Sequence, residues 1–417
     1  MSYEVPLGED TLTFTLTDCD VTVAEPAGGD PVDVRDAAKA AIADPYGRPL
    51  AERVDPDDTV SIVVTDVTRA TPDDVLLDVL LAELERAGVV REQVTVVIGL
   101  GLHRPMTDAE VAEALGEHAD LAVNHDPDRT VEAGTVDGCP IELFETVART
   151  DVVCSTGMVE PHQYAGFSGG AKTAVIGAGG ESQIRYTHGP ELLGREGVRL
   201  GRIEGNPFRE FLDRAGDVAG VAFCLNVTHG PAGITGASAG DPRAVVANLA
   251  ATAREALAVE ITDSYDAVIA GVGAPKDANL YQTTRAATYV VLGAHNPLRP
   301  GGRVVIPARL PEGAGDGTGE QRFYGWLSGA DAPGGLYREM QDGYEPGAQR
   351  AFVVARALRD HDIWVTNSLH SEVVADCLMH HVDSIEDAVE PGSNVLVVPD
   401  ALNTLLEGVT RTEANDS

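Results

Sequence analysis

Apolar and polar residues follow two different periods along the first part of the chain. Residues 3–24 alternate singly, as in LTFTLTDCDVTV, which predicts paired strands or a hairpin. Three apolar runs predict buried strands: 59–66, 93–101 and 151–157. Apolar residues at helical spacing predict helices at 72–88 and 108–116. Buried strands that alternate with helices predict a mostly parallel sheet with helices over its faces.

The same rhythm of strands and helices is repeated in the second part of the chain. Helices are predicted at Pro242–Val259 and around Arg285–Leu292, and strands at 266–276, 301–308, 362–367 and 393–399. We therefore predict an α/β protein with two α/β domains, 1–258 and 259–417, and an active-site cleft between them. The glycine-rich run Pro311–Gly319 is predicted to be a flexible loop and is a candidate lid.

The charge of the chain limits its partners. It has 66 acidic and 30 basic side chains, a formal net charge of −36, and the acidic residues are spread along the chain. Such a field repels nucleic acids and anionic membrane surfaces, so neither is expected as a partner. A surface of this kind suits a cytoplasm rich in salt, where ions screen the repulsion, so we expect a halophilic protein.

Targeting and redox signals indicate a cytoplasmic protein. The N-terminal sequence MSYEVPLGED has no basic region followed by an apolar run, and no apolar stretch is long enough for a membrane helix. The cysteines are odd in number, scattered, and without a CxxC pair: Cys19, Cys139, Cys154, Cys224 and Cys377. They support neither a disulfide framework nor a thiolate zinc site.

Four polar clusters directly follow predicted strands, at 66–72, 99–105, 155–172 and 271–285. Their candidate functional side chains are Asp66, Arg69, His103, His162, Lys172, Lys276, Gln282 and Arg285. Ligands of open α/β sheets collect at the carboxyl ends of strands, so we expect these residues in one shared cleft. Each loop alone also suits helix capping. Asp66 or Thr71 is a candidate cap of helix 72–88, with Pro72 in its first turn.

The segment FSGGAK contains one of only 3 lysines, against 27 arginines. Arginine stays protonated, whereas a desolvated lysine is a nucleophile, so Lys172 is a candidate reactive amine. The alternative is a surface lysine in a loop that leads into a helix. The segment lacks the full phosphate-loop spacing, and GVGAPKD lacks the third glycine of a dinucleotide fingerprint.

Two histidines on separate loops, His103 and His162, suit proton transfer on either side of a substrate, as stereochemical inversion requires. Arg69 and Arg285 suit a carboxylate, which accepts two parallel hydrogen bonds from a guanidinium. The remaining histidines that we considered are interpreted as core, capping or solvated residues: His118, His229, His295, His361, His370, His380 and His381. The last two are expected within a helix.

The motifs DxTRxxP, GLHRP, EPHxxAGFSGGxK and PKDxxLYQ, in this order, resemble the lactate racemase family. The resemblance implies a nickel-pincer nucleotide, a pyridinium-3-thioamide-5-thiocarboxylic acid mononucleotide that holds Ni(II). It implies a thioamide bond to Lys172, a nickel ligand at His188 and catalytic histidines at His103 and His162. It also implies cofactor contacts from Asp66, Arg69, Ser168, Gly169 and Gly170, and substrate contacts from Arg69, Tyr281, Gln282 and Arg285.

The activity implied by this resemblance is racemisation or epimerisation of a 2-hydroxy acid by hydride transfer through a 2-keto acid. The chain departs from the family pattern at Arg285, where the family has lysine. The bulk and bidentate geometry of arginine would reshape a pocket sized for lactate, which favours another 2-hydroxy acid as substrate; the alternative is that Arg285 only follows the general replacement of lysine by arginine in this chain. Two alternatives are an NAD- or nucleotide-dependent α/β enzyme and a non-catalytic protein that binds the nickel nucleotide. A carrier would need Lys172 and His188 but not both His103 and His162. The sequence leaves the oligomeric state open.

Overall fold

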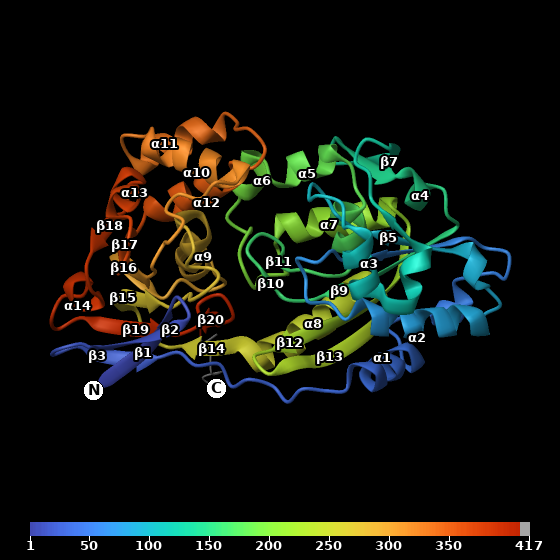
Figure 1. The fold of residues 1–417 in the computed structure, drawn as a ribbon, viewed down its shortest axis with the longest axis horizontal. Coiled ribbons are helices and arrows are strands. Elements are labelled where there is room, and N and C mark those ends of the chain that lie inside the picture. Colours follow the sequence, from blue (N-terminus) through green and yellow to red (C-terminus); the bar gives the residue numbers. More distant parts are fainter. Residues whose placement is uncertain (409–417) are drawn as a thin grey trace, which may run out of the picture. The chain divides into compact units, whose positions relative to one another are not determined.

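The computed structural model describes residues 1–408, which fold as two compact units (Figure 1). The central unit comprises Gly28–Thr187 and Arg202–Ala256. The terminal unit comprises Met1–Ala27, His188–Gly201 and the chain from Leu257 onward. The predicted domain boundary at residue 258 lies close to the point after Ala256 where the chain finally passes into the terminal unit. Residues 1–27 and 188–201, however, belong to the terminal unit and not to the N-terminal domain predicted from the sequence. Residues 409–417 of the predicted second domain lie outside the described residues.

The central unit is built on a six-stranded sheet with the order β13-β12-β9-β4-β5-β6. These strands are β13 (Gly233–Gly240), β12 (Val221–Gly230), β9 (Val152–Met158), β4 (Val60–Val64), β5 (Val94–Ile98) and β6 (Ala122–Asn124). All neighbours pair in parallel except β12 and β13. Every residue of β4 is buried, including Ser61, and the other four residues are apolar, as expected for a strand covered on both faces.

Helices and small hairpins complete the central unit (Figure 1). The helices are α1 (Val34–Ala43), η1 (Leu50–Glu52), α2 (Asp73–Arg86), η2 (Arg91–Gln93), α3 (Asp108–Leu115), η3 (Gly116–Leu121), α4 (Glu145–Ala148), the π-helix η4 (Thr173–Gly177), α5 (Glu181–Thr187), α7 (Pro207–Val218) and α8 (Pro242–Leu257). The hairpins are β7 (Thr130–Val136) with β8 (Cys139–Phe144), and β10 (Pro161–His162) with β11 (Gly166–Phe167). Buried apolar residues such as Ile62 and Leu80 join β4 to α2 in the core.

The terminal unit contains a second six-stranded sheet, which is parallel throughout and has the order β18-β17-β16-β15-β19-β3. Its strands are β3 (Asp20–Val23), β15 (Tyr265–Ala270), β16 (Leu298–Pro307), β17 (Asp362–Thr366), β18 (His380–Val382) and β19 (Asn394–Val398). Two pairs lie outside this sheet: β1 (Ser2–Leu7) with β2 (Asp10–Thr15), and β14 (Ala258–Ile261) with β20 (Leu405–Gly408). The helices are α6 (Pro190–Leu193), α9 (Leu280–Val291), α10 (Thr318–Ser328), α11 (Pro333–Gln341), α12 (Gln349–Leu358), α13 (Ser371–Asp376) and α14 (Ile385–Ala388).

The predicted α/β class with mostly parallel sheets is confirmed, as are the hairpin and the predicted strands. The helix at 72–88 forms, but its predicted capping is wrong. Pro72 is itself the N-cap, no side chain caps the helix, and the Asp66 carboxylate is used elsewhere. The helical assignment of His380 and His381 is also wrong, because both lie in β18, where His380 stacks on Trp364 of β17.

All five cysteines are free thiols, four of them buried. Among the described residues, no helix combines the length and the apolar character needed to cross a membrane.

Candidate active site

The carboxyl ends of four central-unit strands bring together polar side chains at one edge of the sheet. Asp66 and Arg69 follow β4, His103 follows β5, Glu160 follows β9, and His229 lies at the end of β12. Because β4, β5, β9 and β12 run parallel, these ends share one edge. Asp66, Arg69 and His103 were predicted from the sequence as site residues, whereas Glu160 and His229 were not.

Asp66 and His103 form a close pair, with 2.5 Å between Asp66 Oδ2 and His103 Nδ1. The other carboxylate oxygen accepts the backbone N–H of Thr68 at 3.0 Å and the Thr68 hydroxyl. Burial alone would raise the pKa of Asp66, but hydrogen bonds from His103 and Thr68 hold it below its ordinary value. The carboxylate therefore accepts Nδ1–H and leaves Nε2 of His103 as a proton acceptor. With its side chain 59% exposed, His103 is accessible to a substrate.

A buried carboxylate beneath this loop, Asp73, fixes the position of the Asp66 segment. At the first position of α2, it accepts hydrogen bonds from the Thr65 hydroxyl at 2.7 Å, the Thr65 N–H at 3.3 Å and the Thr156 hydroxyl. It thereby connects the end of β4 to β9. Burial raises the pKa of Asp73 to about 6, although the hydrogen bonds from Thr156 and Thr65 oppose this.

The second predicted catalytic histidine, His162, lies in the two-residue strand β10. Its Nδ1 accepts the backbone N–H groups of Tyr164 at 3.3 Å and Ala165 at 3.1 Å. These bonds place the lone pair on Nδ1, so the neutral ring carries its proton on Nε2. Its ring packs against those of Tyr164 and Phe208. In their neutral forms, His103 therefore offers an acceptor at Nε2 and His162 offers a donor.

Lys172 ends the glycine-rich turn and is partly buried. The pKa of Lys172 is lowered to about 7, mainly by burial and also by the nearby guanidinium groups of Arg69 and Arg209, while the carboxylates of Glu160 and Asp66 oppose the shift. Arg209 itself is almost fully buried, and its Nη2 donates to the Phe167 carbonyl at 2.8 Å. A large part of the Lys172 amine is therefore neutral and nucleophilic near neutral pH.

The turn before Lys172 requires glycine. Gly169 and Gly170 have φ of +78° and +62°, and a Cβ on Gly170 would lie 2.7 Å from a Val246 methyl group. The Gly170 N–H donates to Asn226 Oδ1 at 2.7 Å, while the amide nitrogen of this buried Asn226 has no hydrogen-bond partner among residues 1–408. Ser168 secures the other side of the turn through its hydroxyl, which donates to the Met158 carbonyl at 2.6 Å.

The remaining predicted site residues belong to the terminal unit. Tyr281, Gln282 and Arg285 lie in the first two turns of α9, whose N-cap Asn279 accepts the Gln282 N–H. Gln282 Oε1 and Arg285 Nε are buried and have no hydrogen-bond partner within the described part of the chain. His188 directly follows α5 and starts the 188–201 segment of this unit, where its carbonyl accepts the Tyr344 hydroxyl at 2.7 Å. The central unit thus contains Asp66, Arg69, His103, Glu160 and Lys172. The terminal unit contains Tyr281, Gln282, Arg285 and His188.

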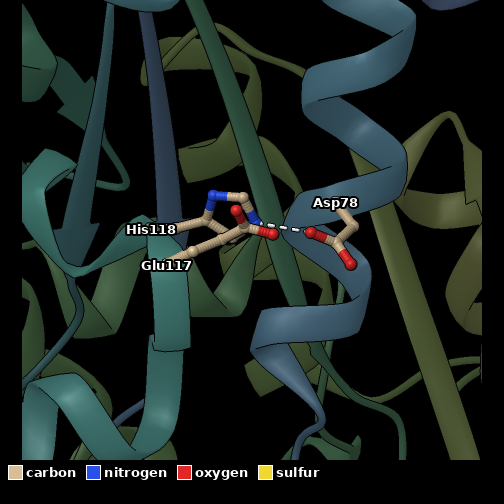
Figure 2. Close-up of side chains that lie close together, drawn as sticks. All are labelled: Asp78, Glu117 and His118. Atoms are coloured by element: carbon tan, nitrogen blue, oxygen red, sulfur yellow. Dashed lines mark hydrogen bonds and ion pairs between the residues drawn. The ribbon is translucent and has the colours of Figure 1, made fainter.

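A separate cluster in the central unit has the composition of a metal site but is a structural network. Figure 2 shows Asp78 of α2 opposite Glu117 and His118 of η3. His118 Nε2 lies 2.7 Å from Asp78 Oδ1, and Arg91 donates to its Nδ1 at 3.2 Å. Arg35 pairs with the other Asp78 oxygen. Because both ring nitrogens and the carboxylate already have partners, this cluster connects α2 to η3, and His118 is the satisfied core histidine that the sequence suggested.

The α/β fold and the comparisons with known proteins identify an enzyme of the isomerase class, a racemase. The lactate racemase N-terminal domain model matches residues 7–201, and the lactate racemase C-terminal domain model matches residues 259–410. The chain belongs to the lactate racemase family, whose members need a metal cofactor.

Two relatives and one solved structure agree with this assignment. The chain is 26% identical to a lactate racemase of Thermoanaerobacterium thermosaccharolyticum, with 98% of both chains covered. It is also 26% identical to one from Lactiplantibacillus plantarum, over 84% of this chain and 85% of that one. The structure of the Thermoanaerobacterium lactate racemase apoprotein superposes with a TM-score of 0.84, at 26% identity, over 98% of this chain and all of the other.

Proposed function

We propose that this protein racemises or epimerises a 2-hydroxy acid related to lactate, with a nickel-pincer nucleotide as cofactor. The observation that carries the proposal is the pairing of a nucleophilic amine with proton-transfer groups at one sheet edge. Lys172 has a pKa of about 7, and Asp66 holds His103 with Nε2 available as a base. Neither an NAD enzyme nor a simple carrier requires both features.

The residues present fit this cofactor. A thioamide bond requires a neutral lysine amine, which the surroundings of Lys172 provide, and the turn at Gly169 and Gly170 brings backbone close to it. Lys172 would hold the group covalently, with Ser168, Gly169, Gly170, Asp66 and Arg69 around it. The imidazole of His188 is a suitable nitrogen ligand for Ni(II). When bound, such a nucleotide would supply an acceptor and donor of hydride for the chemistry at C2 of the substrate.

The protein's own residues supply binding and proton transfer. His103 accepts the proton of the 2-hydroxyl at Nε2, while Asp66 stabilises the imidazolium that forms. The 2-keto acid is planar at C2, so the hydrogen can return to either face. His162, on its separate loop, donates from Nε2 to the oxygen of the opposite enantiomer. Proton release and uptake by different residues allow the configuration to invert.

We assign recognition of the substrate carboxylate to Arg69, Tyr281, Gln282 and Arg285. Arg69 uses Nη1 for Glu160, and the rest of its guanidinium makes no hydrogen bond to the described residues. The bulk and fork geometry of Arg285 favour a 2-hydroxy acid larger than lactate. The charge of −36 further supports work in a salt-rich cytoplasm.

Two experiments test this proposal. The cofactor-loaded protein is incubated with single enantiomers of lactate and of larger 2-hydroxy acids, and the products are separated by chiral chromatography. We expect at least one acid to be racemised, and no conversion of any acid would refute the activity. In parallel, nickel is measured in the purified loaded protein. We expect roughly one nickel per chain, and a strong loss in His188→Ala. Full occupancy in that variant would exclude His188 as a ligand.

A further inference from the structure

Glu160 is a partly buried carboxylate that lies between Arg69, in the loop after β4, and His229, at the end of β12. Its Oε1 lies 2.6 Å from Arg69 Nη1, and its Oε2 lies 3.6 Å from His229 Nε2. The side chains of Glu160 and His229 are 25% and 27% exposed, so water screens the pair only partly. Arg69 follows β4 and His229 ends β12, so Glu160 joins the two strands that flank β9.

The backbone of Glu160 is fixed from both sides. Its N–H donates to the Ser168 hydroxyl at 3.0 Å, and its carbonyl accepts the Ser168 N–H at 2.9 Å. The Ser168 hydroxyl in turn donates to the Met158 carbonyl. With its backbone fixed in this way, Glu160 presents its two carboxylate oxygens to Arg69 and His229, one to each.

We propose that Glu160 and His229 are positioning residues for Arg69, and that protonation of His229 strengthens the binding of the substrate carboxylate. This inference rests on the proposed function and adds to it a control of substrate affinity. When His229 is neutral, the negative charge of Glu160 offsets the positive charge of Arg69. When His229 is protonated, its positive charge compensates part of the charge of Glu160, so the Arg69 guanidinium attracts an anionic substrate more strongly.

The surrounding charges support this. The groups that face Glu160 are Arg69, His229 and Lys172, and together they hold its pKa below the ordinary value although burial opposes this. Lys172 also faces Arg209 and Asp66. His229 faces Glu160 and the Gly230 carbonyl, and the nearby Glu160 carboxylate raises the pKa of His229, against the effect of burial. His229 therefore titrates within the range in which Glu160 stays ionised.

Two measurements test the inference. The first is an NMR titration of His229 in the wild type and in Glu160→Gln, which requires no turnover. The second is the inhibition constant of pyruvate, and the KM and kcat for lactate, at several pH values in the loaded enzyme. The variants are His229→Gln and His229→Asn, two neutral amides of different length. The control is His380→Gln, which removes an exposed histidine 3.9 Å from Asp362 in the terminal unit.

We expect His229 to titrate above the ordinary range in the wild type and lower in Glu160→Gln. As the pH falls through that titration, pyruvate affinity should increase roughly three- to tenfold in the wild type and in His380→Gln. Both His229 variants should lose this increase while kcat at high pH stays within about threefold. An identical pH dependence of affinity in all proteins, or a His229 titration unchanged by Glu160→Gln, overturns the inference. Absence of any turnover would instead refute the proposed function, and the NMR titration would still decide whether the pair exists.

Discussion

Substitution of Asp66 by asparagine isolates the control that Asp66 exerts over His103. In the wild type, Asp66 Oδ1 accepts the Thr68 N–H at 3.0 Å and Oδ2 accepts Nδ1–H of His103. An asparagine must keep its carbonyl oxygen on the Thr68 N–H, because its amide group cannot accept a hydrogen bond. The amide then donates to Nδ1 of His103 and shifts the ring proton to Nε2, where the base is needed.

The size of the effect follows from the same contacts. The asparagine side chain can turn its carbonyl oxygen toward Nδ1–H of His103 and so keep Nε2 as the base. Its amide group then faces the Thr68 N–H, and the lost hydrogen bond costs about 1–3 kcal/mol. Loss of the charge-assisted bond to the imidazolium costs about 1.5–3 kcal/mol more. Since about 1.4 kcal/mol corresponds to a factor of ten, kcat should fall roughly 10²–10⁴-fold.

The assay is the racemisation rate of the preferred 2-hydroxy acid in loaded enzyme, with nickel content measured on the same samples. Nickel should be retained, and KM should change much less than kcat. Asp57→Asn, which neutralises an exposed carboxylate in the loop before β4, is the control for loss of one negative charge. If Asp66→Asn keeps kcat within threefold of the wild type at full nickel content, the tautomer argument is wrong.

Three further predictions follow from the other groups. Lys172 should carry a nucleotide adduct that adds mass to the peptide containing FSGGAK, whereas Lys172→Arg should lack it because its guanidinium is protonated; fully active wild type without the adduct would contradict this. Because the pKa of Asp73 is raised from its ordinary 3.8 to about 6, its ionisation opposes folding, and raising the pH from 4 to 7 should cost up to roughly 3 kcal/mol of unfolding free energy. Asp73→Asn should flatten that part of the urea-unfolding profile, and an unchanged slope would exclude Asp73 as its source. Arg285→Lys should weaken use of the native substrate and improve use of lactate through a smaller side chain of the same charge; unchanged KM and kcat for every acid would exclude a role in specificity.

The strands and helices near the site were predictable because each carries a clear local signal. β4 is apolar at four of its five positions because both faces of the sheet are covered, and α2 shows helical spacing. The capping of α2 was not predictable from local signals. Asp73 and Asp66 both make contacts outside the helix, with Thr65 and Thr156 in one case and His103 in the other. These contacts join residues that are brought together only by the order of the strands in the sheet, which local sequence patterns do not determine.

The residues of the candidate site were likewise predictable only where a local motif marks them. Asp66, His103 and Lys172 stand in distinctive motifs, and so could be selected from the sequence. His229 stands in NVTHG, which has no motif, and its proximity to Glu160 arises only because β12 pairs with β9. His229 does share one sequence signal with Asp66 and His103, because it stands at the end of an apolar strand. His380 looked helical because an edge strand of three residues is too short to show a period of two.

The central claim is that the hydrogen on C2 leaves and returns without exchange with water while His103 and His162 move only the hydroxyl proton. The most direct test is to incubate loaded enzyme in ordinary water with one enantiomer of lactate, or of the preferred acid, deuterated at C2. The inverted product is then isolated by chiral chromatography and its deuterium content determined by mass spectrometry. We predict that the inverted product retains its deuterium. Replacement of that deuterium by protium at the rate of inversion would show that a proton is removed from C2, and would contradict the proposed mechanism.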